Sequence, residues 1–206
     1  MTDELATFDD ARSMRYTRVY PHPIADVWDA VTDAEQLDVW LAPACGVVVE
    51  RRVGGRCVFG FGSPIKDGFE GTVTEYDPPN VVHYQLEGSS LRFELEPVAG
   101  GTKLAFIHAF EPGIVSPAFD PAELPAGPGT PWHPDFCAGF HVMIDQLGEL
   151  LDGTWTIADA KPFVDAVYHG GDVYGLMEQR PAAMKQRHEN LIARYRVHIK
   201  ENCPAP

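Results

Sequence analysis

A chain of 206 residues can form one large domain, or one domain with a further segment attached, and can bury a substantial core. Its formal charge of −14 is uneven: residues 1–152 hold 9 basic and 24 acidic side chains, whereas residues 153–206 hold 7 and 6. An acidic surface without a basic cluster repels phosphate backbones and anionic lipid headgroups, so neither nucleic acid nor a membrane is an expected partner.

The N-terminus lacks the basic and apolar regions of a signal peptide, and no apolar run reaches the length of a membrane span. We therefore expect a cytoplasmic protein. The four cysteines are scattered without metal-ligand spacing, which predicts unpaired thiols and no metal site: Cys45, Cys57, Cys137 and Cys203. Neither a phosphate-binding glycine motif nor a Gly-x-Ser-x-Gly motif occurs, so we expect no nucleotide and no other cofactor.

The N-terminal part of the chain predicts one strand and two short helices. Residues 1–13 indicate a flexible acidic leader, and residues 15–20 a first strand. Pro23 then suits the first turn of a helix whose apolar residues are Val27, Trp28 and Val31. A second helix follows at once, with a capping box from Thr32 to Glu35 or from Asp33 to Gln36, and ends before Pro43.

Six further strands are predicted between residues 47 and 110, separated by glycine- and proline-rich turns: 47–52, 56–61, 69–76, 81–87, 91–96 and 103–110. Their spacing favours an antiparallel meander. Alternation predicts an inward row of Val82, Tyr84, Leu86, Leu91, Phe93, Leu95, Leu104, Phe106, His108 and Phe110, with His83, Gln85, Arg92, Glu94, Glu96 and Lys103 outward. His108 is the one polar residue of the inward row.

The strongest helical signal follows a proline-rich loop. Residues 111–131 hold six prolines and three glycines without periodicity, which indicates a binding loop or lid. Residues 131–152 then place one apolar stripe on a helix that ends at Gly153, with acidic and amide residues on its other face: Asp135, Asp145, Gln146, Glu149 and Asp152. One long amphipathic helix after a run of strands predicts an α+β fold in which the helix covers the concave face of the sheet.

Residues 154–206 predict a helical C-terminal extension. The segment 154–171 gives a weak helical pattern, and residues 181–200 give a stronger one with apolar residues on one side: Met184, Leu191, Ile192, Tyr195 and Ile199, together with His188. We expect this side to pack on the body of the protein or on a second copy, so a homodimer through the extension is one expectation.

Five motifs carry a resemblance to a known family. They are PIADVWDAVTDAEQLDVWL, the Gly54-Gly55-Arg56 turn, GTVTEYDPPNVVHY, GTKLAFIHAF and GFHVMIDQLGELLDG, in this order along about 140 residues. The chain resembles the bacterial proteins similar to the activator of the heat-shock-protein-ninety ATPase, within the SRPBCC (START-like, birch-pollen-allergen-like) superfamily. The resemblance implies a helix-grip domain over residues 14–153, with a curved antiparallel sheet around the long helix and an apolar cavity between them.

Two departures from the family pattern lie where a cavity mouth is expected. Phe140 stands where many relatives have Trp, and the loop after residue 110 is longer than usual. Family membership leaves several functions open, since this fold includes lipid and hormone carriers, polyketide cyclases, oxygenase substrate domains and co-chaperones. The oxygenase role requires an iron site, for which this sequence supplies no ligands.

The sequence therefore predicts a binding protein for a small apolar ligand, with no catalytic residue assigned. The expected ligand-binding residues are Trp40, Tyr84, Phe93, Phe106, His108, Phe110, Phe136, Phe140 and Ile144. A buried His108 can bind a ligand oxygen, or serve as acid and base in a cyclase- or hydrolase-like enzyme on an aromatic or polyketide substrate; a satisfied core histidine is the simpler interpretation. A co-chaperone of the stress response is the third hypothesis. Cys137 and His141, four residues apart, are interpreted as core residues rather than a metal or thiolate pair.

Overall fold

The computed structural model describes residues 4–41, 47–60, 68–114, 124–126, 130–156, 158–159 and 182–204. The strands of these residues are β1 (Thr7–Asp10), β2 (Ser13–Tyr20), β3 (Val48–Val49), β4 (Arg56–Phe59), β5 (Phe69–Asp77), β6 (Val81–Leu86), β7 (Ser89–Val98) and β8 (Gly101–Phe110). The helices are α1 (Ile24–Thr32), α2 (Ala34–Trp40), α3 (Pro134–Leu151) and α6 (Ala182–Asn202).

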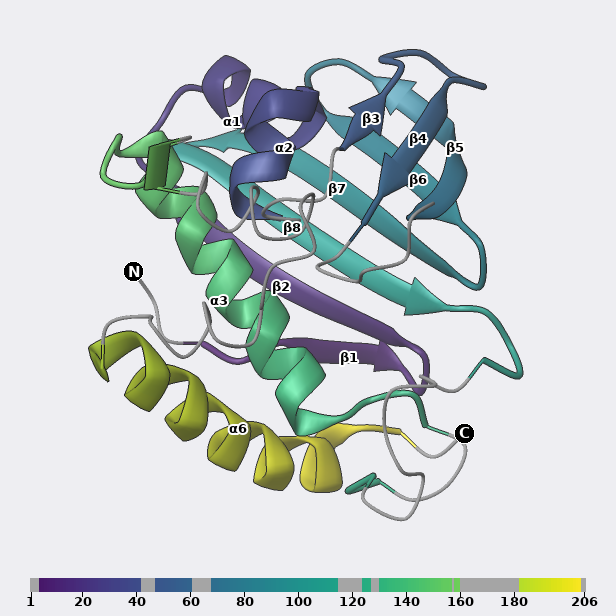
Figure 1. The fold of residues 1–206 in the computed structure, drawn as a ribbon, viewed down its shortest axis with the longest axis vertical. Coiled ribbons are helices and arrows are strands. Elements are labelled where there is room, and N and C mark those ends of the chain that lie inside the picture. The colour runs from purple at the N-terminus through teal and green to yellow at the C-terminus, as the bar shows by residue number, and fades with distance from the viewer. Residues whose placement is uncertain are drawn as a thin grey trace.

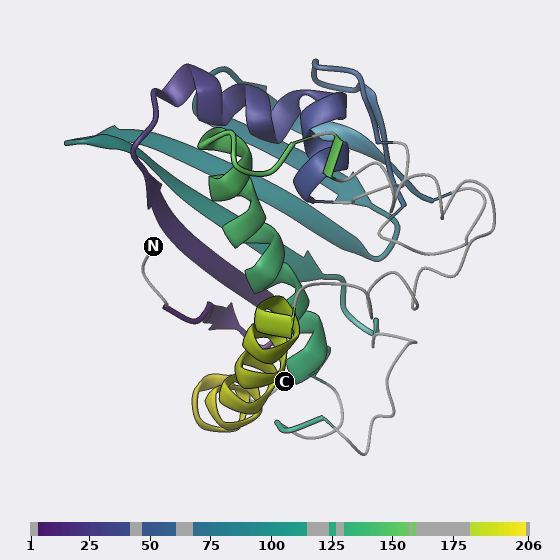
Figure 2. The same ribbon diagram turned by 60° about the vertical axis from the view of Figure 1, so that its left-hand side comes forward.

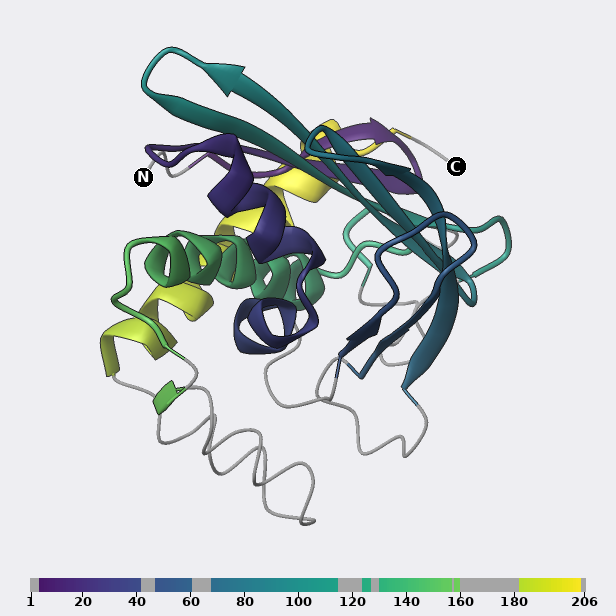
Figure 3. The same ribbon diagram turned by 90° about the horizontal axis from the view of Figure 1, so that it is seen from above.

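All eight strands form one antiparallel sheet in the order β1-β2-β8-β7-β6-β5-β4-β3. The strands from β3 to β8 are therefore consecutive neighbours, as the predicted meander requires, and β2 returns beside β8. Helices α1, α2 and α3 lie on the same side of the curved sheet, with α3 running across its concave face (Figures 1 and 3). This confirms the α+β helix-grip fold.

Residues 7–10, expected to belong to a flexible leader, instead form the edge strand β1. Thr7 is opposite Arg15 and Phe8 is opposite Met14 in the register with β2. The side chain of Phe8 supports this position, because its ring lies 6.0 Å from that of Trp132 and 5.6 Å from that of His198. The acidic TFDD sequence gives no strand pattern of its own, and the rings that stabilise the strand, Trp132 and His198, are far away in the chain.

The two faces of the sheet follow the predicted alternation. The apolar residues predicted to point inward on β6, β7 and β8 are buried, except Phe110, which is half-buried at the end of β8. On the opposite face, Arg92 binds Glu94 at 2.7 Å and Arg15 binds Glu94 at 3.2 Å. These ion pairs are partly exposed, so each contributes little to stability on its own.

Helix α3 begins at Pro134, three residues after the start of the predicted pattern, and ends before Gly153 as predicted. The His133 side chain accepts a hydrogen bond from the Asp135 N–H, Pro134 occupies the first turn, and Gly153 follows the helix with φ of +69°. Two tyrosine hydroxyls of β2 donate to carbonyl oxygens of α3: Tyr16 to Cys137 at 2.6 Å and Tyr20 to Ile144 at 2.8 Å.

The predicted polar face of α3 is only partly exposed. Asp145 and Gln146, expected in water, are 6% and 3% exposed, because α6 packs along this side of α3. Figures 1 and 2 show α6 beside α3 and close to β1. The apolar side of α6 is thus buried within the same chain: Leu191, Tyr195 and Ile199 are at most 2% exposed. The weaker helix predicted at 154–171 lies almost wholly outside the described residues.

No helix among the described residues is both long and apolar enough to cross a membrane. Most of the proline-rich loop at 111–131 lies outside those residues, so the lid remains a prediction.

Candidate functional site

The candidate site is built around His108, at the end of β8 that leads into the proline-rich loop. The strand register places His108 between Met14 of β2 and Leu91 of β7, both fully buried. Four aromatic rings complete its surroundings, at centroid distances of 4.6 Å for Phe110, 5.1 Å for Phe140, 5.3 Å for Phe136 and 6.0 Å for Trp132. These six side chains around His108 are called the histidine cage below.

The imidazole of His108 is buried without a full set of hydrogen bonds. His108 is 4% exposed, and none of the described residues forms a hydrogen bond with its Nδ1. Burial among apolar groups lowers the pKa of His108 to about 3, because the protonated ring loses its solvation. The ring is therefore neutral near pH 7, with one nitrogen able to donate and the other able to accept.

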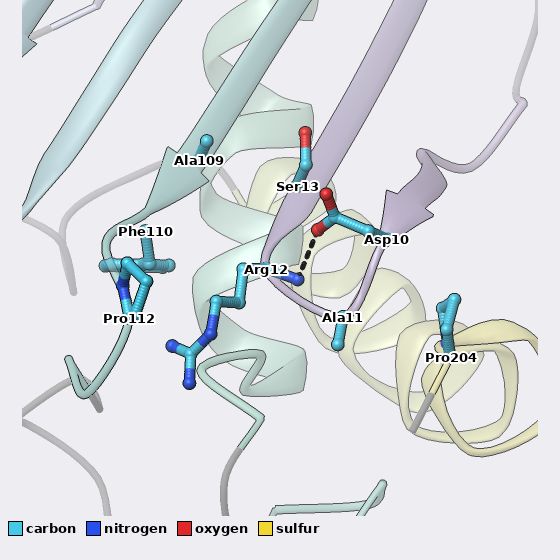
Figure 4. Close-up of a pocket in the computed structure, with 8 residues that line it drawn as sticks. All are labelled: Asp10, Ala11, Arg12, Ser13, Ala109, Phe110, Pro112 and Pro204. Carbon is cyan, nitrogen blue, oxygen red and sulfur yellow. Dashed lines mark hydrogen bonds between the residues drawn. The ribbon is translucent and has the colours of Figure 1, made fainter. Parts of the chain in front are cut away.

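A surface pocket lies directly beside the histidine cage. It has a volume of about 460 Å³ and is lined by Asp10, Ala11, Arg12, Ser13, Ala109, Phe110, Pro112 and Pro204 (Figure 4). Phe110 belongs to both, since it lines the pocket and packs edge-on against His108 at an interplanar angle of 75°. One half-buried ring thus contacts both the pocket and the buried imidazole.

The other predicted site residues lie deeper in the core. Phe106 connects them to the histidine cage, because its ring is 5.4 Å from Phe140 and stacks on Phe93 at 4.9 Å. Trp40 and Tyr84 donate buried hydrogen bonds to the Ala30 and Val31 carbonyls of α1 at 2.8 and 2.9 Å. Trp40 therefore joins α2 to α1, and Tyr84 joins α1 to the sheet.

The structure brings together four of the nine predicted site residues: His108, Phe110, Phe136 and Phe140. Trp40, Tyr84, Phe93 and Phe106 form the adjoining aromatic core, and Ile144 is 1% exposed one turn after Phe140 on α3. A ligand contact of any of the nine residues remains a prediction.

The hydrogen-bond partners of His141 lie on β2 and α6. Burial raises the pKa of the Cys137 thiol well above its ordinary value, so it stays protonated near pH 7. His141 Nε2 lies 3.0 Å from Arg18 Nη2, and His141 Nδ1 lies 3.0 Å from the Tyr195 hydroxyl. This buried arrangement joins β2, α3 and α6, and no pattern in the sequence predicts it.

Trp132 and Arg12 are the site residues that sequence reasoning missed. Trp132 is fully buried, and its Nε1 donates to the Ala11 carbonyl at 3.0 Å, which fixes the indole beside the histidine cage. Its position two residues before Pro134, where α3 begins, could have predicted this contact, since a ring there lies against His108 and Phe110 at the end of β8. Arg12 offered no signal in the sequence, because it lies in the turn between β1 and β2, and β1 was not predicted.

Comparisons with known proteins agree with this architecture. The family described as Activator of Hsp90 ATPase homolog 1-like protein matches residues 21–152. Among curated proteins, none matches the chain. Solved structures with a similar fold include an AHSA1-like protein from Aeromonas hydrophila, with 19% identity over 68% of this chain and 92% of that one, at a TM-score of 0.50.

Two further structures are similar over comparable lengths. A protein from Mesorhizobium loti is 22% identical over 70% of this chain and 100% of that one, with a TM-score of 0.50. A conserved protein of unknown function from Enterococcus faecalis is 14% identical over 72% of this chain and 77% of that one, with a TM-score of 0.53. At these identities the likeness concerns the fold alone.

Proposed function

Since this chain belongs to the family of Activator of Hsp90 ATPase homolog 1-like proteins, we propose that it binds a small apolar molecule between the sheet and α3. The histidine cage forms the inner end of this site, and the pocket beside Phe110 is the way in. The fold by itself does not select this role, because the same architecture serves carriers, enzymes and co-chaperones.

The observation that carries the proposal is the unpartnered Nδ1 of His108 inside an apolar cage. Leaving a buried polar atom without a hydrogen bond costs about 1–3 kcal/mol. A core histidine kept only for packing has no reason to carry this cost, since an apolar side chain of similar volume would avoid it. A ligand oxygen that reaches Nδ1 would remove the penalty in the bound state.

Phe110 gives the ligand a route to this nitrogen. The ring is half-buried and belongs to the last residue of β8, so it is less constrained than the fully buried rings of Phe106 and Phe93. Rotation of this one side chain would join the pocket of about 460 Å³ to the histidine cage, and that volume is in the range typical of small-molecule sites.

Binding is favoured over acid–base catalysis by the same geometry. A histidine with a pKa of about 3 is a weak base near pH 7, and catalysis is most efficient when the pKa lies close to the working pH. No side chain among the described residues hydrogen-bonds Nδ1 to orient the ring. A cyclase- or hydrolase-like activity through His108 therefore has less support than ligand binding.

A co-chaperone role is the second candidate, favoured by the family's description. Such a role needs an exposed apolar contact surface. The large apolar side chains exposed among the described residues are scattered over the fold: Val19 on β2, Val48 on β3, Val53 in a turn, Phe69 on β5 and Val197 on α6. Stimulation of a chaperone ATPase by the purified protein would support this role over ligand binding.

The proposal is tested by looking for a retained molecule. Protein purified from its own host should show a bound small molecule in native mass spectrometry, and apolar compounds should raise its melting temperature. Phe136→Trp enlarges a ring of the histidine cage and should abolish both effects. Phe69→Trp makes the same change at an exposed, distant position and should leave both intact. Absence of any adduct and of any melting shift across a broad apolar screen would contradict the proposal.

A further inference from the structure

The composition of the histidine cage limits the chemistry of what it can bind. We infer that the ligand is an uncharged aromatic molecule with a hydroxyl group, and that the hydroxyl bonds His108 Nδ1 while the aromatic ring takes the place of Phe110. This inference rests on the proposed function and adds the charge, the anchoring group and the ring to it.

The first step concerns charge. Met14, Leu91 and the four aromatic rings of the histidine cage are all uncharged, and the buried imidazole is neutral near pH 7. A carboxylate placed there would lose its water without gaining a cation. The sequence as a whole carries a formal charge of −14, which further disfavours an anion.

Arg12, which lines the pocket outside the histidine cage, is a cation that is already partly engaged. Its guanidinium nitrogen Nη1 donates to the carbonyl oxygens of Glu111 at 3.1 Å and Ile114 at 3.4 Å. Asp10 lines the same pocket, and its carboxylate accepts from the Arg12 backbone N–H at 2.7 Å (Figure 4). A carboxylate ligand in the pocket would therefore meet one acid and a cation already engaged with backbone oxygens.

The second step concerns the anchoring group. A neutral imidazole carries its proton on one nitrogen only, so Nδ1 of His108 is either a donor or an acceptor. A ligand carbonyl can only accept a hydrogen bond, so it satisfies Nδ1 only in the tautomer in which Nδ1 is the donor. A hydroxyl can donate or accept, so it satisfies Nδ1 in both tautomers and is the group that fits this site best.

The third step concerns the ring. Three neighbours meet the His108 ring close to edge-on, at 75° for Phe110, 73° for Trp132 and 64° for Phe136. Edge-to-face contacts of this kind add about 0.5–1.5 kcal/mol beyond the buried area. A flat ligand ring that displaces the half-buried Phe110 would recover its contact with His108, whereas a flexible alkyl chain would not.

The inference is tested with three compounds that share one ring system: 2-naphthol, naphthalene and 2-naphthoate. Equilibrium binding to the full chain should be about ten-fold tighter for 2-naphthol than for either of the others, as expected for one buried hydrogen bond. His108→Leu should reduce the affinity for 2-naphthol to that for naphthalene. His83→Leu changes a histidine on the opposite face and should alter none of the three affinities.

Each other outcome has a definite meaning. Equal affinity for naphthalene and 2-naphthol would overturn the inference and leave the proposed function standing. Tightest binding of 2-naphthoate, lost in Arg12→Gln, would overturn it in favour of an anion site at the pocket. Failure of all three compounds to bind would reject an aromatic ligand, and with an empty native mass spectrum it would reject the proposed function as well.

A spectroscopic measurement avoids dependence on the folding of His108→Leu. In the wild-type protein labelled with ¹⁵N-histidine, saturating 2-naphthol should shift the Nδ1 resonance of His108, and naphthalene should leave it nearly unchanged. A shift of equal size with both compounds would show that ring packing alone, rather than a hydrogen bond, alters this histidine.

Discussion

Replacing Tyr195 by Phe removes one hydroxyl on which three segments of the chain converge. Arg18 can only donate, so its contact of 3.0 Å makes His141 Nε2 the acceptor and leaves the proton on Nδ1. The Tyr195 hydroxyl therefore accepts two hydrogen bonds, from His141 Nδ1 at 3.0 Å and from the Ala6 N–H at 2.9 Å. Tyr195→Phe removes the acceptor that these two buried donors share.

The expected loss in the free energy of unfolding follows from these two donors. Each unpaired buried donor costs about 1–3 kcal/mol, and local relaxation recovers part of this, so Tyr195→Phe should destabilise the protein by about 2–4 kcal/mol. Tyr20→Phe also removes a buried hydroxyl, but one that donates to the Ile144 carbonyl at 2.8 Å within α3. The Ile144 carbonyl keeps the helical N–H four residues later as a donor, so Tyr20→Phe should cost only about 1 kcal/mol.

The assay is urea denaturation at neutral pH followed by circular dichroism. Tyr76→Phe is the matched control, because the Tyr76 hydroxyl accepts one exposed hydrogen bond from Arg51 at 3.3 Å and its loss should stay within about 0.5 kcal/mol. If the midpoints of Tyr195→Phe and Tyr76→Phe were the same, the hydroxyl would not be what holds α6 to α3 and to Ala6, and the reasoning would be refuted.

Three further predictions concern α3, His108 and the extension. Leu147→Ala should lower the free energy of unfolding by about 2–5 kcal/mol, since Leu147 is fully buried, whereas Glu149→Ala should not lower it measurably; equal denaturant midpoints would contradict the orientation of α3. Burial depresses the pKa of His108 to about 3 in the folded protein from 6.5, so the unfolded chain binds the extra proton between these values. Stability should therefore fall as the pH drops from about 6.5 towards 3, and urea midpoints of His108→Leu should show a smaller slope over that window. A chain cut after Gly153 should lose stability or aggregate, because it uncovers the surface under Leu191, Tyr195 and Ile199; a soluble monomer of unchanged melting temperature would disprove this.

Most of the fold could be predicted from the sequence because its signals are local. Alternation along β6, β7 and β8 fixes which residues point inward, and the spacing of Phe136, Phe140 and Leu147 fixes the buried side of α3. The Asp33 cap of α2 was one of two predicted alternatives, and its carboxylate accepts from the N–H groups of Glu35 and Gln36. Each of these features depends on residues close together in the chain.

The features that sequence reasoning missed depend on distant partners. Strand β1 is stabilised by Phe8 against Trp132 and His198, and Asp145 is buried because Arg187 of α6 covers it. The residues next to each of these positions in the chain show no pattern that predicts the strand β1 or the burial of Asp145. The same holds for the candidate site: His108 was found as an exception to an apolar row, but Trp132 became part of its surroundings only through the long-range packing of the loop before α3.

During synthesis, the backbone of Ala6 can form its hydrogen bonds with Tyr195 and His198 only after nearly the whole chain has been made. The hydrogen bonds from Ala6 to Tyr195 and from His198 to Ala6 join residues separated by 189 and 192 positions. Contacts of such separation form late, because the intervening chain must first be ordered. A nascent chain halted before α6 would therefore carry β1 without this support, as a loosely held sheet edge that can pair with a neighbouring chain. Chaperone capture of stalled chains should accordingly end once residues 182–202 have emerged from the ribosome.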